Sequence, residues 1–419
     1  MTILLRNGNL FTEKGAAERD LLVSGGKLFV FEPGKAPTAD AERIIDLNNK
    51  YIIPGLTDVH VHFREPGFSY KETIATGTGA AARGGYTAVC TMPNLDPVPD
   101  CLSHLAAQEA LIARDAVIHV YPYGAITVGE KGEKLADFAA LAPRVCAFSD
   151  DGHGVQQDDR MEAAMRLAKQ LGKLIVAHCE VNELLRGGNI HDGAYARAHG
   201  HAGICSESEW RQIERDLNLA AKNGCGYHVC HISCKESVDL IRQAKRTGVD
   251  VSCETAPHYL TLDERDLQED GRFKMNPPLR APEDREALIE GVLDGTIEVI
   301  ATDHAPHSPE EKARGLKGSP FGIVGLETAF PILYTRLVRP GILPLETLLR
   351  CLISNPRNRF CLPIGTDYSV WDLDERYEID PNRFASKGRA TPFAGEAVFG
   401  KCYLTVCDGK IVYQENTNE

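Results

Sequence analysis

The sequence has no long hydrophobic run, no excess of basic residues, no internal repeat and no low-complexity segment. Because no apolar stretch approaches the ~18 residues of a membrane-spanning helix, we do not expect an integral membrane protein. The apolar start is interrupted at Arg6 and Asn7, too early for a secretory signal. Lys and Arg number 46 against 59 Asp and Glu, and the net charge of −13 argues against nucleic acid or an anionic membrane as partner.

The sequence also lacks the cysteine spacing of a disulfide framework. Its 13 cysteines are scattered singly through apolar stretches, as at Cys90, Cys146, Cys225 and Cys253. This distribution fits reduced, buried thiols in a cytoplasmic protein. A chain of 419 residues is long enough for a barrel of about 250 residues and a smaller second domain.

Short β-branched runs alternate with longer helical patterns from about residue 55 to residue 340. Eight strands are expected, at Gly55–His62, Thr87–Met92, Ile118–Tyr123, Val145–Ser149, Leu174–His178, Tyr227–His231, Val249–Glu254 and Val299–Thr302. This alternation predicts an α/β fold, a (β/α)8 TIM barrel. An open doubly wound sheet is the alternative, and the absence of a GxGxxG turn after the first strand disfavours it. The seventh strand is the weakest of the eight predictions, because a loop through Asn276–Arg280 precedes its next helix.

The two ends of the chain differ from the middle. Residues 1–53 and 364–419 contain strand-turn-strand patterns with Gly or Asp-Gly turns and few helix signals. Neither end has enough apolar residues for a core of its own. We therefore expect a small β-sandwich domain built from both termini, with the barrel domain, residues 54–363, inserted between them.

A first pair of candidate metal ligands lies in TDVHVHFREPG, Thr57–Gly67. Side chains alternate along a strand, so His60 and His62 project to one face, and two imidazoles so placed form half a metal site. The motif by itself is weak, because a second pair, His199 and His201, occurs where no strand is expected.

Four more ligand-type residues follow apolar strand-like runs: Asp151, His178, His231 and Asp303. Carboxyl ends of barrel strands meet at one rim, so these residues and the first pair are predicted to converge there. Four histidines and two carboxylates suit a pair of divalent cations such as Zn²⁺.

Two neighbouring cations need a shared anionic ligand. No lysine occurs between Lys134 and Lys169, so the fourth strand cannot supply a carboxylated lysine, and Asp151 or Asp150 is the candidate bridge. The other aspartate would then support the site or cap a helix. Asp303 could also take a proton from the attacking water and give it to a leaving amide nitrogen, or act only as a structural ligand.

Arg64 and Asn94 are candidates for binding a substrate anion. Arg64 lies two residues after the histidine pair, where its guanidinium could bind a carboxylate, although a surface arginine is the alternative. Asn94 closes the run VCTMPN, and the alternative is a turn residue before Asp96. The polar, glycine-containing segment His307–Phe321 fits a mobile lid or a solvated loop.

Four motifs together resemble a known family. TDVHVHFREPG, TMPN (Thr91–Asn94), NPPLR (Asn276–Arg280) and ATDHAPH (Ala301–His307), in this order, are similar to bacterial dihydroorotases of the amidohydrolase superfamily. The resemblance spans about residues 50–340. It implies a zinc-dependent barrel that interconverts N-carbamoyl-L-aspartate and L-dihydroorotate in pyrimidine biosynthesis.

The resemblance also implies a role for each matched residue. His60 and His62 would ligate one Zn²⁺, His178 and His231 the second, and Asp151 would bridge the two ions. Asp303 would be a metal ligand and the catalytic acid/base. The substrate-binding residues would be Arg64, Asn94 and His307 at the carboxylate, with Asn276 and the backbone of Phe321 and Gly322 at the ring amide and carbonyl. A homodimer is expected, and association with aspartate carbamoyltransferase is compatible with the family.

Two other functions stay open at this point. A hydantoinase- or allantoinase-type cyclic amidohydrolase is disfavoured by the missing lysine and by Arg64 and His307, since those substrates need no carboxylate clamp. A non-catalytic dihydroorotase-like partner protein is disfavoured by the complete ligand set, because unused buried polar groups are costly.

Overall fold

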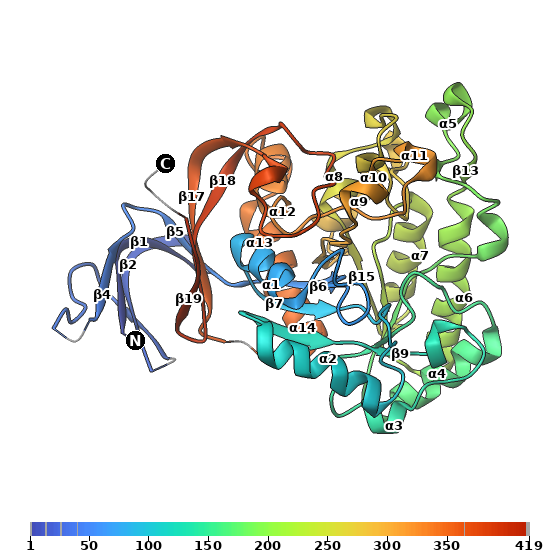
Figure 1. The fold of residues 1–419 in the computed structure, drawn as a ribbon, viewed down its shortest axis with the longest axis horizontal. Coiled ribbons are helices and arrows are strands. Elements are labelled where there is room, and N and C mark those ends of the chain that lie inside the picture. The colour runs from blue at the N-terminus through green and yellow to red at the C-terminus, as the bar shows by residue number, and fades with distance from the viewer. Residues whose placement is uncertain (1, 13–14, 26, 40, 364, 416–419) are drawn as a thin grey trace.

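The computed structural model describes residues 2–12, 15–25, 27–39, 41–363 and 365–415. A barrel surrounded by helices forms the larger part, and a β-rich domain lies at one side of it, at the left in Figure 1. Among the described residues, no helix combines the length and the hydrophobicity required to cross a bilayer.

The barrel consists of parallel strands in chain order. They are β6 (Leu56–Val61), β7 (Tyr86–Thr91), β8 (His119–Pro122), β9 (Gly124–Ala125), β10 (Phe148–Ser149), β11 (Ile175–Ala177), β14 (Tyr227–Val229), β15 (Val251–Thr255) and β16 (Val299–Ile300). β8 pairs with β7 and β9 pairs with β10, so together they form the third barrel strand. The barrel closes where the His62 amide donates to the His304 carbonyl at 2.8 Å. The predicted (β/α)8 barrel is confirmed.

Helices cover the outside of the barrel and connect its strands. They are α1 (Ile74–Arg83), α2 (Leu102–Asp115), α3 (Phe138–Leu141), α4 (Asp158–Gln170), α5 (Ala194–His199), α6 (Glu207–Asn223), α7 (Lys235–Arg246), α8 (Pro257–Thr261), α9 (Pro282–Leu293), α10 (Pro309–Lys312), α11 (Gly315–Gly318), α12 (Ala329–Leu333), α13 (Leu345–Leu352) and α14 (Ser354–Arg359). In α6, the buried residues Ile213, Leu217 and Ala220 recur every three to four positions, which gives the helix one apolar face toward the barrel.

The seventh strand differs from the expectation. β15 has five residues, whereas β10 has only two, so the prediction that the seventh strand is the weakest was wrong. The long connection after β15 begins only once the strand has ended, at α8. Polar residues in β15 are stabilised inside the protein, as where the Thr255 hydroxyl donates to the Ile232 carbonyl at 2.9 Å.

Strands from both ends of the chain form one eight-stranded sheet. They are β1 (Ile3–Thr12), β2 (Gly15–Ser24), β3 (Lys27–Phe31), β4 (Arg43–Asp46), β5 (Tyr51–Pro54), β17 (Tyr368–Glu378), β18 (Ala397–Cys407) and β19 (Lys410–Gln414). β5 pairs with β17 in antiparallel register, which joins the two termini. Residues such as Leu5, Leu21, Val370 and Leu404 belong to one apolar core. Both ends of the chain contribute residues to this core.

The β-domain packs closely on the barrel. The Thr405 hydroxyl donates to the Ala82 carbonyl at 2.7 Å, and the rings of Trp371 and Phe330 are 4.2 Å apart. Gly85 has a φ of +79°, and a Cβ there would lie 2.3 Å from Trp371. This turn before β7 therefore requires glycine, for its backbone conformation and for its lack of a side chain.

His119 in β8 forms an ion pair with Asp367 across this junction, with Nε2 3.0 Å from Oδ2. The hydrogen bond to Asp367 raises the pKa of His119 above its ordinary value, although partial burial opposes this. A raised pKa in the folded state stabilises the protein below about pH 6.5, and the effect is lost as pH rises through the folded-state pKa.

We therefore expect His119→Gln to lower the free energy of unfolding more at pH 5.5 than at pH 8.5. The difference should not exceed about 1 kcal/mol, because the imidazole is partly exposed. Urea unfolding of both proteins at the two pH values measures it. An equal loss at both values would show that the charge of His119 does not stabilise the junction.

Candidate metal centre and substrate cavity

A cavity of about 210 Å³ opens at the carboxyl ends of the barrel strands. Eleven of the twelve residues expected from the sequence line it: His62, Arg64, Asn94, Asp151, His178, His231, Asn276, Asp303, His307, Phe321 and Gly322. The twelfth, His60, is fully buried and contacts two of the lining residues. The structure thus brings residues from seven barrel strands and their loops to one place.

The first group of candidate ligands surrounds the end of β6. His62 Nε2 lies 3.2 Å from Asp303 Oδ1 and 3.4 Å from Asp151 Oδ2. His60 Nε2 lies 3.3 Å from Asp151 Oδ1 and 3.5 Å from Asp303 Oδ1. Side chains from three separate strand ends therefore offer nitrogen and oxygen atoms to a common centre.

The second group shares Asp151 with the first. His178 Nδ1 and His231 Nε2 are 2.9 Å apart, and each lies 3.8 Å from Asp151 Oδ1. The Asp151 carboxylate thus lies between the two histidine pairs. This is the position of a bridging ligand for two cations.

Asp150 has a different environment, which separates the two aspartates that the sequence left open. Its Oδ1 accepts hydrogen bonds from the amides of Ile126 and Thr127 at 2.7 and 2.9 Å. Its other oxygen accepts from the Thr127 hydroxyl. Asp150 therefore fixes the segment after β9 and is directed away from the histidines, whereas Asp151 is directed toward them.

The atoms in this cluster fit a divalent cation. His60 Nε2 and Asp151 Oδ1 are both buried and have no hydrogen-bond partner, although they are 3.3 Å apart. The other nitrogen of His60, Nδ1, contacts Glu254 Oε1 at 2.5 Å. Burial lowers the pKa of His60, but the charges of Asp151 and Glu254 outweigh it and raise the pKa well above its ordinary value. The space between His60 Nε2 and Asp151 therefore favours a positive charge, which a bound cation would supply.

A second side chain likewise orients the ring of His62. Its Nδ1 donates to Asn94 Oδ1 at 2.9 Å, which leaves Nε2 free to bind a cation. Burial lowers the pKa of His62, and the Arg64 charge adds to that effect, so the imidazole is neutral as a ligand must be. The same contact leaves the amide hydrogens of Asn94 for another acceptor.

Asp303 is ionised at neutral pH. Burial by itself would raise its pKa, but the contact with His62 Nε2 and the other nearby histidines hold it at about 2. Its backbone has a φ of +49°, and those of Arg64 and His231 are +58° and +30°. Such conformations are rare for residues other than glycine, and their clustering here is typical of a functional site.

Arg64 supplies the positive charge of the cavity. Its Nε donates to the Pro306 carbonyl at 3.3 Å. No carboxylate in the described ranges forms an ion pair with it, although the side chain is half-buried. A guanidinium of this kind, unpaired at a cavity wall, is suited to a carboxylate of a ligand.

His307 has both ring nitrogens engaged. Nε2 donates to the Phe321 carbonyl at 2.8 Å, and Nδ1 lies 3.2 Å from Lys71 Nζ. Burial together with the charges of Arg64 and Lys71 lowers the pKa of His307 to about 3. In this arrangement the neutral imidazole holds the Phe321–Gly322 backbone at the cavity.

The segment His307–Phe321 is more ordered than the sequence suggested. It contains α10 and α11, and the buried Lys312 donates to the carbonyls of Lys274, Pro320 and Gly322 at 2.7 to 3.1 Å. These bonds also fix Gly322 at the cavity. Lys312 therefore fixes part of the segment, while residues such as Arg314 and Lys317 are exposed to solvent.

The sequence reasoning missed several residues behind the cavity. Glu180 Oε1 accepts from Asn276 Nδ2 at 2.8 Å, and its Oε2 lies 3.6 Å from His178 Nε2. Glu254 contacts His60, and Lys71 contacts His307. None of these residues has a local sequence signal that assigns it to the cavity. By contrast, His201 bonds Glu269 on the surface, and the His199–His201 pair takes no part in the cavity.

A closed (β/α)8 barrel with four histidines and two aspartates at one mouth suits metal-assisted hydrolysis, and relatives of known structure are cyclic amidohydrolases of the amidohydrolase superfamily. Solved structures agree. L-hydantoinase (dihydropyrimidinase) from Arthrobacter aurescens is 26% identical with a TM-score of 0.87, covering 98% of this chain and 96% of its own. D-hydantoinase from Thermus sp. has 24% identity and a TM-score of 0.83, with 98% and 94% covered.

Sequence relatives give the family. Dihydroorotases from Bacillus cereus (strain AH820) and Bacillus anthracis are each 49% identical over 427 residues, covering all of this chain and 99% of the relative. A family model described as Dihydro-orotase-like matches residues 49–237. The chain belongs to the dihydroorotase family. The higher identity to dihydroorotases than to hydantoinases disfavours the hydantoinase alternative.

Proposed function

We propose that this chain catalyses the reversible cyclisation of N-carbamoyl-L-aspartate to L-dihydroorotate with two bound Zn²⁺ ions. One observation favours this substrate above all. The unpaired guanidinium of Arg64 lines the same cavity as the two ligand groups, so the site suits a cyclic amide that carries a carboxylate.

We propose that His60, His62 and Asp303 hold one cation, and His178 and His231 the other, with Asp151 between them. When bound, such ions activate water for attack and polarise the carbonyl oxygen of an amide. Nitrogen and carboxylate ligands in this combination favour Zn²⁺ over Mg²⁺ or Ca²⁺. The identity and number of the ions are part of the proposal.

Asp303 is the proposed acid/base. As an ionised carboxylate it accepts the proton of the attacking water, and it then donates this proton to the ring nitrogen as the amide bond breaks. In the cyclisation direction it takes the proton from the attacking carbamoyl nitrogen and gives it to the departing oxygen. Its position beside His60 and His62 places it at the reacting atoms.

The remaining cavity residues orient the substrate. Arg64 and the free amide hydrogens of Asn94 bind the exocyclic carboxylate, which reduces the entropic cost of reaching the transition state. Asn276 and the backbone of Phe321 and Gly322 face the ring amide and carbonyl. His307 is proposed to contact the carboxylate as well, and this requires its Nε2 hydrogen to exchange the Phe321 carbonyl for the substrate.

The homodimer, the association with aspartate carbamoyltransferase and the cytoplasmic location remain predictions from the family resemblance. The boundaries of the domains, at residues 53 and 364, also remain predictions.

Metal removal tests the proposed function. We expect purified protein to hydrolyse L-dihydroorotate in a spectrophotometric assay, to lose at least about 100-fold of this activity after chelation, and to regain it when Zn²⁺ is added back. Elemental analysis of the same samples gives the ions per chain. Hydantoin and allantoin, assayed alongside, should be poor substrates. Full activity in the chelated, metal-free protein would contradict the proposal, and a preference for hydantoin would favour the alternative.

A further inference from the structure

A continuous series of polar groups runs through the interior of the barrel, starting at His60. His60 Nδ1 contacts Glu254 Oε1 at 2.5 Å, and Glu254 Oε2 lies 3.1 Å from His228 Nε2. His228 Nδ1 then lies 2.7 Å from Ser252 Oγ, to which Arg359 Nε donates at 2.7 Å. The series thus links a candidate metal ligand with an arginine at the end of α14.

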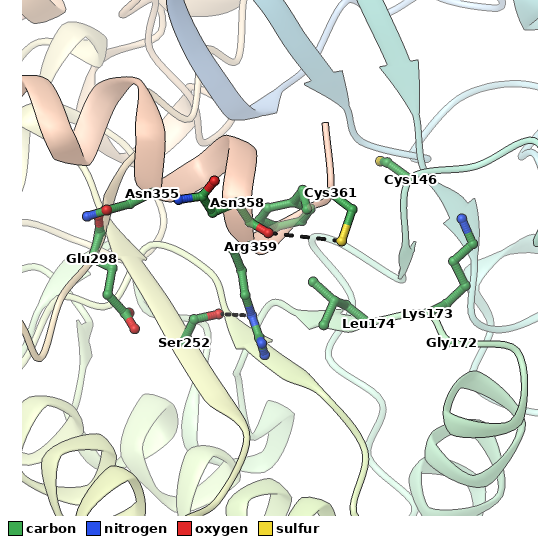
Figure 2. Close-up of a pocket in the computed structure, with 11 residues that line it drawn as sticks. Cys146, Gly172, Lys173, Leu174, Ser252, Glu298, Asn355, Asn358, Arg359 and Cys361 are labelled. Carbon is green, nitrogen blue, oxygen red and sulfur yellow. Dashed lines mark hydrogen bonds between the residues drawn. The ribbon is translucent and has the colours of Figure 1, made fainter. Parts of the chain in front are cut away.

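The outer end of the series lies at the opposite mouth of the barrel. Ser252 and Arg359 line a separate cavity of about 540 Å³. Its other lining residues include Leu174 and Glu298, which directly precede β11 and β16, so the cavity is at the amino ends of the strands. Figure 2 shows the Arg359 side chain extending from α14 to Ser252, where the dashed line marks their hydrogen bond.

The inner three residues of the series are closed off from solvent. His60, His228 and Glu254 are all 0% exposed. The ring of His228 also packs edge-on against Phe360, with centroids 5.0 Å apart. Because the interior is closely packed, a change at one member of the series is not relieved by water or by a new rotamer.

The chemistry of the two ends sets the direction of every hydrogen bond. A carboxylate only accepts, so Glu254 receives protons from His60 Nδ1 on one side and His228 Nε2 on the other. With its Nε2 proton donated to Glu254, the His228 ring can accept at Nδ1 from the Ser252 hydroxyl. A guanidinium only donates, so Arg359 keeps the Ser252 oxygen as an acceptor and its hydrogen directed at His228. The result is that His60 carries a proton on Nδ1, and Nε2, which faces Asp151, is the atom that would bind the cation.

We propose that Glu254 is a positioning residue for the metal centre and that His228, Ser252 and Arg359 extend its effect to the opposite mouth of the barrel. The series holds His60 in one tautomer and one orientation, and thereby sets the affinity of the cation that His60 binds. This inference rests on the proposed metal centre, since it requires His60 to be a ligand.

Metal affinity of Glu254 variants tests the inner part of the series. Metal-free protein is titrated with Zn²⁺ against a chromogenic chelator, and Co²⁺-loaded protein gives an absorption spectrum of the ligand environment. We expect Glu254→Ala to weaken Zn²⁺ binding by about 10–100-fold and to change the Co²⁺ spectrum. Glu254→Gln can still accept a hydrogen bond from His60, so its loss of Zn²⁺ affinity should be smaller. Glu209→Gln is the matched control, because Glu209 is equally buried but bonds Ser233 and Ser237 instead.

The outer part is tested at Arg359. Arg359→Met should weaken Zn²⁺ binding by about threefold or more, and Arg359→Lys, which can still donate to Ser252, should restore part of it. Lys173→Met is the control, since Lys173 lines the same cavity but donates to the Val145 carbonyl.

The outcomes separate this inference from the proposed function. Wild-type affinity in Glu254→Ala, with Zn²⁺ bound, would overturn the role of Glu254 and leave the metal centre standing. Weakened binding in Glu254→Ala but not in Arg359→Met would overturn the extension to the opposite mouth. A wild-type protein that binds no Zn²⁺ would overturn the proposed metal centre itself.

Discussion

Asp303→Asn is expected to lower turnover in both directions by about 10²–10⁴-fold while most of the bound metal is retained. The amide has the shape of the carboxylate and one oxygen that can still contact His60 and His62, but it cannot accept the proton of the attacking water. Hydrolysis and cyclisation rates, measured with the metal content of the same preparations, give the result. The loss should lie in kcat more than in KM, because the proton moves only in the chemical step.

The control for Asp303→Asn is a buried aspartate outside the cavity. Asp216 is fully buried, accepts from Tyr227 at 2.8 Å and pairs with Arg215. Asp216→Asn tests whether loss of a buried charge in this barrel reduces turnover through stability alone. Near-normal turnover in metal-loaded Asp303→Asn would leave Asp303 as a structural ligand only. Loss of both ions from it would show that its main role is to hold the metal.

Much of the fold was predictable because each barrel strand and helix has a local signature. α6 is an example, since its apolar positions recur with helical spacing and Gly224 stops it. Strand limits were less accurate. Val145–Ser149 was expected as a strand, yet only Phe148 and Ser149 pair, because ladder hydrogen bonds depend on neighbouring strands rather than on local sequence.

The location of the cavity was predictable for a related reason. His178, His231 and Asp303 each follow an apolar run, and parallel strands bring such positions to one rim whatever their distance along the chain. Asp150 and Asp151 could not be separated in this way, because adjacent residues share the same strand end. Only the amides of Ile126 and Thr127, from the preceding barrel strand, show which of the two is held away from the histidines.

Residues behind the cavity were not predictable. Lys71 reaches His307 from a position 236 residues away in the sequence, and Glu254 reaches His60 across 194 residues. A lysine before a helix and a glutamate in a strand have no pattern that assigns them to a site. Their roles depend on tertiary contacts that form only in the closed barrel.

Arg64→Met is the second change with a large expected effect, and it tests the substrate rather than the metal. Removing the guanidinium should lower kcat/KM for L-dihydroorotate by about 10²–10³-fold, because the substrate carboxylate would enter the cavity without its charged partner. Methionine, like arginine, has a Cβ, so the substitution does not relieve the strain of the positive φ of +58° at residue 64. A change in activity is then attributable to the lost charge rather than to a relaxed backbone.

Dihydrouracil makes this experiment specific, because it is dihydroorotate without the carboxylate. Its slow hydrolysis should be nearly unchanged in Arg64→Met, so the preference for dihydroorotate should collapse by the same factor as kcat/KM. Arg64→Lys should recover part of the rate, since the charge returns without the two-pronged geometry. The metal content should stay at the wild-type level in each variant. Equal losses for both substrates would show that Arg64 maintains the structure of the cavity rather than binding the carboxylate. Unchanged kinetics would show that Arg64 does not bind the carboxylate.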